Sequence, residues 1–410
     1  MRLPSDLPRD VLAMAAVALC VALGFGVVAP AIPLLATQFG VSATAAGAVV
    51  SAFALMRLLS GLGAGRLVDA VGERTGLTVG IAVVAVSSLL AGLAQSYPQL
   101  LILRGVGGVG SAVFGVAAVS LVLRVAARRV RARAMSVYRT GFLVGGIVGP
   151  AVGGAVLGIS LRAPFFLYAG SLVLAGVVAM VFVARPAPAV DTEADGVTGE
   201  QQGADPAAAP QEISEPEPTL RTVIRTREYQ AALVANFAEG LSVFGIRSAV
   251  VPLLIVEGLG AAPGWVGVAF LISSLVQTAL MLPAGRWADL AGRRRTLVTG
   301  AIVAAGGLVL LGFGGSLVLA LVAMAVFGAG AAFLGTVPGA LVGDVAGRRS
   351  GTVVAVFNMA SDLGAVIGPV LAGALVDRGS FGAAFGLGAV VVVVAGLFGL
   401  RVRNPHAPSA

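Results

Sequence analysis

Residues 65–74 read GRLVDAVGER, and residues 285–294 read GRWADLAGRR. The two stretches share Gly, Arg, Asp and a second Gly at the same spacing, 220 positions apart. Two further matches occur at an offset of 219. The first pairs Phe25-Gly26 and Ile32-Pro33-Leu34-Leu35 with Phe244-Gly245 and Val251-Pro252-Leu253-Leu254. The second pairs Gly145, Gly149 and Pro150 with Gly364, Gly368 and Pro369. Three matches at nearly one offset indicate a duplicated unit.

The composition around these repeats places the chain in a membrane. Hydrophobic residues make up 58% of 410 positions and charged residues 11%, whereas soluble domains carry about a quarter charged residues. Apolar runs of about 20 residues, enough to cross a bilayer as a helix, recur between charge clusters. They do not alternate apolar with polar residues, which excludes a transmembrane β-barrel. We predict twelve spans, at 11–35, 44–64, 77–95, 99–123, 134–158, 164–184, 231–256, 264–284, 296–314, 316–342, 352–375 and 380–400.

The predicted fold is therefore an all-α membrane protein of two homologous six-helix bundles. Residues 1–184 form the N-terminal bundle and residues 231–410 the C-terminal bundle. Residues 185–230 between them are rich in Pro, Ala, Gly and acids, which predicts a flexible cytoplasmic linker. Parallel repeats of this kind place a substrate site between the halves, near the middle of the membrane.

The basic residues predict the orientation. All 27 are arginines, and with both termini inside, 21 lie in cytoplasmic segments and two, Arg162 and Arg378, lie outside. The other four fall within spans: Arg57, Arg104, Arg139 and Arg247. An excess of cytoplasmic arginine predicts a multi-pass protein of a bacterial inner membrane with both termini in the cytoplasm. The first apolar run has no cleavage site, so we interpret it as a span, not a signal peptide.

Several classes of function are excluded. The sequence has no Walker phosphate loop and no nucleophile, base and metal constellation, so we expect neither an ATP-driven pump nor an enzyme. One cysteine, Cys20, and one histidine, His406, cannot build a metal cluster, and we expect no cofactor. The arginines are spread over the loops between spans and do not form a surface that could bind nucleic acid. The expected partners are a small-molecule substrate, protons and the lipid bilayer, with the chain acting as a monomer.

The duplicated loop resembles the signature of the major facilitator superfamily, and the resemblance covers essentially the whole chain. It implies the major facilitator fold and secondary transport. It also implies that the loop acts as a cytoplasmic latch, in which a carboxylate engages helix ends in one state, as a helix N-terminus favours. The alternative interpretation is that the charges of this loop only set the orientation of the chain in the membrane. The residues concerned are Gly65, Asp69, Gly72 and Arg74 in the first copy and Gly285, Asp289, Gly292 and Arg293 in the second.

Span 5 carries a ridge of glycines at every fourth position, and a proline directly follows the third of them. The ridge resembles the antiporter motif of the drug:proton branch of the superfamily, which implies efflux. Close helix packing is its physical basis, and ordinary packing is the alternative, represented by Ala360, Gly364, Gly368 and Ala372 in span 11. We expect leucine at Gly149 to bias the inward–outward equilibrium, with a smaller effect at Gly368. The ridge comprises Gly141, Gly145, Gly149 and Gly153, and the motif comprises Gly145, Gly149, Pro150, Gly153 and Gly154.

Three charged residues within spans are candidates for proton coupling. Arg104, followed by Gly107, Gly108 and Gly110, resembles the family's span 4 motif, whose arginine is associated with proton coupling; a structural charge held by helix carbonyls is the alternative. Glu239 and Asp362 are the only acids in the spans, each roughly 12–17 Å deep. A buried carboxyl group can release and rebind a proton, whereas arginine cannot. A static ion pair with Arg57 or Arg139 is the alternative role for either acid.

The predicted function is export of a drug-like compound or metabolite by proton antiport with alternating access. A proton-coupled nutrient or osmolyte symporter, or a non-transporting membrane sensor, are the alternatives. The charge of the substrate stays open, because the acids favour a cation and the arginines an anion. The expected substrate cavity contains Arg57, Tyr138, Asn236, Phe244, Arg247 and Asn358.

Overall fold

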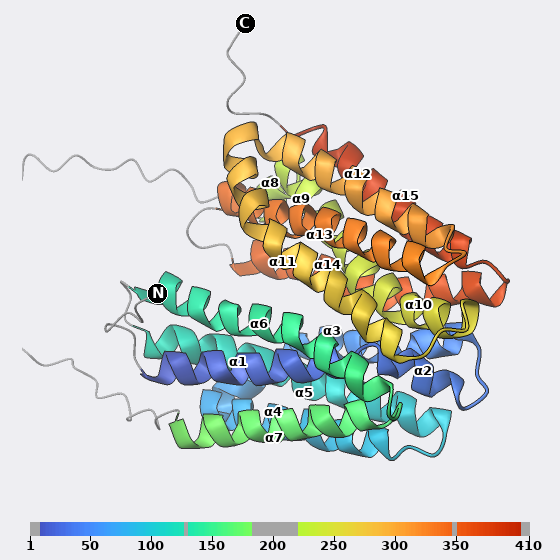
Figure 1. Cartoon of the computed structure of the whole chain (residues 1–410). Helices are drawn as coiled ribbons and strands as arrows, with labels where there is room; N and C mark the ends of the chain where they lie inside the picture. The colour runs from blue at the N-terminus through green and yellow to red at the C-terminus, as the bar shows by residue number, and fades with distance from the viewer. Residues whose placement is uncertain (1–8, 127–129, 183–219, 347–350, 403–410) are drawn as a thin grey trace, which may run out of the picture.

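The computed structural model describes residues 9–126, 130–182, 220–346 and 351–402. In this part of the chain, twelve helices are long and apolar enough to cross a membrane. Figure 1 shows the helices of the N-terminal half packed in one bundle and those of the C-terminal half in a second bundle beside it. The predicted all-α fold with twelve spans is confirmed.

The N-terminal half begins with a span made of two helices, α1 and α2, which are separated by Ala29 and Pro30. The other five spans are single helices. The bounds are α1 Arg9–Val28, α2 Ala31–Thr37, α3 Ala43–Val71, α4 Glu73–Gly92, α5 Tyr97–Val125, α6 Arg131–Leu157 and α7 Ala163–Phe182.

The C-terminal half begins with the short helix α8 and then a long first span, Arg227–Gly258, that changes its helical geometry three times. Two π-helical segments alternate with α-helix along this span, and the wider turn of a π-helix rotates the residues that follow it. The bounds are α8 Leu220–Val223, α9 Arg227–Glu239, π-helix Gly240–Ile246, α10 Arg247–Leu253, π-helix Leu254–Gly258, α11 Gly264–Ala291, α12 Arg293–Gly312, α13 Leu317–Ala346, α14 Gly351–Asp377 and α15 Phe381–Gly399.

The duplicated motif proves to be helix and not loop over most of its length. Hydropathy ends span 2 at residue 64, but α3 continues to Val71, and only Gly72 separates it from α4. Gly72 has φ 84°, and Gly292 between α11 and α12 has φ 89°. A side chain is strained in this conformation, so glycine is needed where one helix turns directly into the next.

The predicted linker is shorter at its C-terminal end than the composition indicates. Residues 183–219 lie outside the described residues, whereas 220–230 contain α8 and the first turn of α9. Thr226 caps α9, because its hydroxyl accepts a hydrogen bond from the backbone N–H of Tyr229 at 3.3 Å. This cap satisfies an N–H group that would have no partner within the helix.

The glycine ridge of α6 packs against α1 in the same half. A methyl group on Gly149 would lie 2.6 Å from the carbonyl oxygen of Leu23, and one on Gly153 would lie 2.8 Å from that of Val27. The first two ridge glycines meet the carbonyls of Ala15 and Leu19 in the same way. Both helices therefore present every fourth residue, which brings their backbones into direct contact.

The counterpart ridge in α14 is packed just as closely, contrary to the expected weaker contact. A methyl group on Gly368 would lie 2.7 Å from the carbonyl oxygen of Leu241, and Gly364 meets Phe237 and Leu241. Gly240, in the first π-helical segment, likewise contacts the backbone of Ser361 in α14. The first π-helical segment thus packs on α14 without intervening side chains.

The two halves meet at the end of the molecule opposite Arg9 and Val402, the first and last described residues; this end is here called the far end. Gly154 of α6 touches Gly267 of α11 backbone to backbone, and Gly47 of α3 touches Pro369 of α14. Gly267 also meets the carbonyl of Pro150, as Gly47 meets that of Pro369. The two crossings are equivalent under the internal repeat, since Gly267 corresponds to Gly47 and Pro369 to Pro150. Close glycine contacts therefore hold the far end together symmetrically.

Candidate substrate cavity

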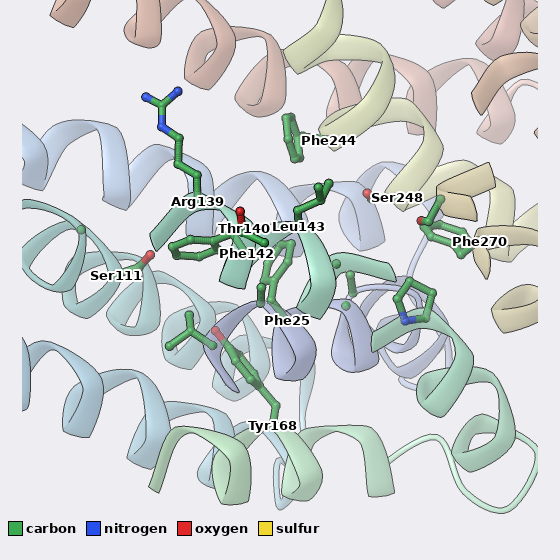
Figure 2. Close-up of a pocket in the computed structure, with 18 of the residues that line it drawn as sticks. Phe25, Ser111, Arg139, Thr140, Phe142, Leu143, Tyr168, Phe244, Ser248 and Phe270 are labelled. Atoms are coloured by element: carbon green, nitrogen blue, oxygen red, sulfur yellow. The ribbon is translucent and has the colours of Figure 1, made fainter. Parts of the chain in front are cut away.

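A cavity of about 1100 Å³ lies between the two halves. Along α6 its wall runs from Pro150 to Met135, and Met281 of α11 also lines it, so it extends from the far-end crossings toward the chain termini. Figure 2 shows Phe25, Phe142 and Tyr168 of the N-terminal half on one side and Phe244 of the C-terminal half on the other. A cavity of this size accommodates a drug-sized molecule.

Three of the six predicted cavity residues line this wall: Arg57 of α3, Phe244 of the first π-helical segment and Arg247 of α10. The wall does not include the other three. Tyr138 is buried against Phe142, with ring centroids 5.4 Å apart. The amide nitrogen of Asn236 donates a hydrogen bond to the carbonyl of Phe357 at 2.6 Å, and Asn358 is an exposed residue of α14.

Arg57 and Asp362 form an ion pair between the halves, from α3 to α14. Arg57 lies 14 residues into α3 from the far end, about 21 Å along the axis, which is near the middle of the membrane. Closer to the far end, the Ser51 hydroxyl donates a hydrogen bond to the carbonyl of Val366 at 2.6 Å. The pair is thus the deepest in a series of polar contacts between these two helices.

Glu239 lies away from the cavity wall. It ends α9, and its carboxylate lies beside Gly335 of α13, where a methyl group would come within 3.0 Å of the oxygen. Glu239 interacts electrostatically with Arg247, but the two form no salt bridge. The two membrane acids therefore have different surroundings: Asp362 links the halves, and Glu239 is held inside the C-terminal half.

Arg247 and Arg104 each stack on a phenylalanine of the cavity wall. The Arg247 guanidinium lies 5.1 Å from the ring centroid of Phe270 and donates a long hydrogen bond of 3.4 Å to Ser273. The Arg104 guanidinium lies 4.5 Å from the ring of Phe53 and is buried behind it. In both arginines the Nε–H group is buried and has no partner among the described residues.

Two arginines of the duplicated motif, Arg74 and Arg293, bind within their own halves. Arg74 donates a hydrogen bond to the carbonyl of Met180 at 2.5 Å, and Arg293 pairs with Asp344 and donates to the carbonyl of Ala340 at 2.7 Å. Asp69 and Asp289 are exposed and have no ion pair or hydrogen bond within the described residues. The latch proposed for these acids stays a prediction, because residues 347–350, which precede α14, lie outside the described residues.

Sequence reasoning missed most of the α6 face that lines the cavity, including Ser136, Arg139, Thr140 and Leu143. These residues recur at intervals of three and four, on the side of the helix away from the glycine ridge. That period was available in the sequence. It shows which residues share a face, but not that the face borders a cavity.

The chain matches the Major Facilitator Superfamily over residues 14–228 and 232–410. It belongs to this family. Among curated relatives in the superfamily, Multidrug resistance protein 2 of Bacillus subtilis (strain 168) is 28% identical over 364 residues, 87% of this chain and 86% of the relative. Quinolone resistance protein NorA of Staphylococcus aureus (strain MRSA252) is 27% identical over 165 residues, 40% of this chain and 42% of the relative.

Solved structures of transporters share the fold. A bacterial homolog of the human lysosomal transporter Spinster, in an inward-facing and occupied conformation, superposes with a TM-score of 0.71 at 16% identity, covering 95% of each chain. The human organic anion transporter MFSD10 superposes with a TM-score of 0.65 at 17% identity, covering 97% of this chain and all of the other. The family match and the twelve candidate spans together make the chain a multi-pass secondary transporter of the superfamily.

Proposed function

We propose that this transporter exports a small amphipathic molecule, a drug-like compound or metabolite, in exchange for protons. The chain termini lie in the cytoplasm of a bacterial inner membrane, as the arginine distribution supports. The far end then faces outward, and the cavity extends toward the cytoplasm. The likeness to multidrug resistance proteins supports export, and the amphipathic wall supports a substrate with both apolar and polar parts.

The observation that carries the proposal is the ion pair of Arg57 with Asp362 across the two halves. A proton on Asp362 removes the negative charge and breaks the pair. A substrate that takes Arg57 as its partner breaks the same pair from the other side. Each ligand can therefore release the same link between α3 and α14, and alternating access requires such a link.

Export proceeds as follows. The substrate enters from the cytoplasm, displaces Asp362 from Arg57 and lets the halves part at the far end. After the substrate leaves, Asp362 takes a proton from outside. The protein then returns to the conformation that is open to the cytoplasm, with the carboxyl group of Asp362 neutral. Loss of that proton to the cytoplasm restores the ion pair. Glu239 and Arg104, inside their respective halves, tune the charge around this cycle.

Everted membrane vesicles test the coupling. Their lumen is acidified by respiration and carries a fluorescent pH probe, and a panel of drugs and metabolites is added outside. Exchange raises the pH of the lumen. Asp362→Asn should abolish this rise while leaving binding intact, because the amide keeps its size but cannot release a proton. An undiminished rise would remove Asp362 as the proton carrier. Glu257→Gln, an exposed acid near the far end, is the control.

Co-transport is a second candidate, and the same ion pair favours it for an anionic substrate. When an anion occupies Arg57, Asp362 loses its ion-pair partner and can carry a proton instead, so both ligands can cross together. The direction of flux driven by a pH gradient in proteoliposomes separates the two couplings. A protein that only senses its ligand would bind without any flux.

A further inference from the structure

The charge of the cavity wall is positive. Among its described residues are three arginines, Arg57, Arg139 and Arg247, and no acid. They come from both halves, on α3, α6 and α10. Asp362 already pairs with Arg57, so a cation that entered this space would meet mainly the like charges of Arg139 and Arg247.

Two of these arginines lack a carboxylate partner within hydrogen-bonding distance. Arg139 is exposed toward the cavity and forms no ion pair or hydrogen bond within the described residues; Figure 2 shows its side chain extended away from its helix. Arg247 has only the 3.4 Å hydrogen bond to Ser273, and its buried Nε–H is unpartnered. Glu239 offsets the charge of Arg247 from a distance and does not reach the wall.

The net charge of the residues predicted to lie inside the membrane is positive, like that of the cavity wall. Four arginines lie within the spans predicted from the sequence against two acids, and one acid, Asp362, is already bound to Arg57. Charges at this depth are costly unless they are paired or face water. An anion that fills the cavity would supply the missing partner and satisfy donors that the protein leaves open.

We infer that the substrate is an amphipathic organic anion, with an aromatic or other apolar body and one or two carboxylate, sulfonate or phosphate groups. The acidic groups first contact Arg139 and Arg247, which lack a carboxylate partner, and reach Arg57 when the substrate displaces Asp362. Planar guanidinium groups bind oxyanions through paired hydrogen bonds. The apolar body packs among Phe25, Phe142 and Tyr168. This inference rests on the proposed transport function but not on the direction of proton coupling.

Two xanthene dyes of similar size and opposite charge test it. The intact purified protein in detergent is titrated with carboxyfluorescein, an anion, and with rhodamine 123, a cation, and fluorescence anisotropy reports binding. We expect the anion to bind at least about tenfold more tightly, the change that one charge-assisted interaction produces. Preference for rhodamine 123, equal affinity for both dyes, or no binding of either would overturn the inference.

Variants locate the anion. Arg139→Gln and Arg247→Gln should each weaken carboxyfluorescein binding about tenfold, and Arg139→Lys should restore most of the affinity because it keeps the charge. Arg133→Gln is the matched control, an exposed arginine fewer than two turns away on the same helix. Gel filtration identifies a variant that fails to fold. Unchanged affinity in both glutamine variants would place the anion elsewhere and overturn the inference.

Flux separates this inference from the proposed function. Anion-selective binding without movement of dye across proteoliposomes under a pH gradient or a membrane potential would support the charge of the site and contradict transport. Movement of the cation with exclusion of the anion would support transport and contradict the anionic substrate.

Discussion

The carboxylate of Asp377, the last residue of α14, caps the first turn of α3 at Thr44 in the other half. Asp377 accepts hydrogen bonds from the backbone N–H groups of Ala43 at 2.7 Å and Thr44 at 2.9 Å, and from the Thr44 hydroxyl. A carboxylate at a helix N-terminus satisfies free N–H groups and faces the positive end of the helix dipole. A capping residue normally lies next to the helix that it caps in the sequence. This cap joins two halves that must separate during transport.

Asp377→Asn should therefore weaken closure at the far end. Replacing the charged cap costs about 1 kcal/mol, which shifts a two-state equilibrium roughly fivefold toward the conformation that is open there. Spin-label distances between Ile159 and Ala262, exposed residues of opposite halves at this end, should lengthen. Glu257→Gln removes another acid at the same end as a control. Identical distance distributions in wild type and Asp377→Asn would show that the cap does not contribute to closure.

The far-end glycine crossings predict a stronger effect. Alanine at Gly267 would overlap the backbone of Gly154, and alanine at Gly47 would overlap the carbonyl of Pro369. Each substitution should hold the far end open and stop transport, although each half still folds. The same spin-label pair and a flux assay measure this. Gly170→Ala, where a methyl group meets open space, is the control, and wild-type flux in Gly267→Ala would refute the prediction.

Gly149→Leu should act on stability more than on the inward–outward equilibrium, because Gly149 packs on α1 within one half. Overpacking of this kind costs about 1–3 kcal/mol. The loss at Gly368 should be similar, since the two positions lie 2.6 and 2.7 Å from their opposing carbonyls. Thermal unfolding in detergent compares the two variants, with Gly146→Leu as a control for stability alone, because its surroundings are open. A much smaller loss at Gly368 would restore the expectation of a weaker second ridge.

Glu239→Gln should tighten the binding of an anion. The neutral amide fits beside Gly335, but it no longer offsets the charge of Arg247. We expect the dissociation constant of carboxyfluorescein to fall a few-fold, the size of a partly screened interaction between separated charges. Anisotropy titration measures it against Glu257→Gln. Weaker binding would mean that Glu239 orients Arg247 rather than neutralising it.

The linker prediction concerns residues 187–218, outside the described part of the chain. A Gly/Ser segment of equal length should preserve transport, since composition and not a fold defines this stretch. Flux at matched membrane levels is the measurement. Lost activity would indicate a docking or regulatory element there.

The sequence by itself determined the twelve spans, the duplication and the close packing of span 5. Lipid offers no hydrogen bonds to the backbone, so every long apolar run must be helical, and hydropathy is enough to find it. Glycine at every fourth residue likewise predicts backbone contact whichever helix lies opposite. The turns at Gly72 and Gly292 were less visible, because α3 and α11 remain helical after their apolar runs end.

Only the tertiary structure decided which charged residues meet. Counting residues from the end of a span gives a depth in the membrane but not the direction in which a side chain points. Glu239 and Asp362 lie at similar predicted depths, yet one lies beside Gly335 and the other binds Arg57. Between Glu239 and Arg247 the chain passes through a π-helical segment, whose wider turn changes the rotation that an α-helical count assumes. Helix rotation is set by packing against neighbours, so the positive wall of the cavity emerges only when both halves are assembled.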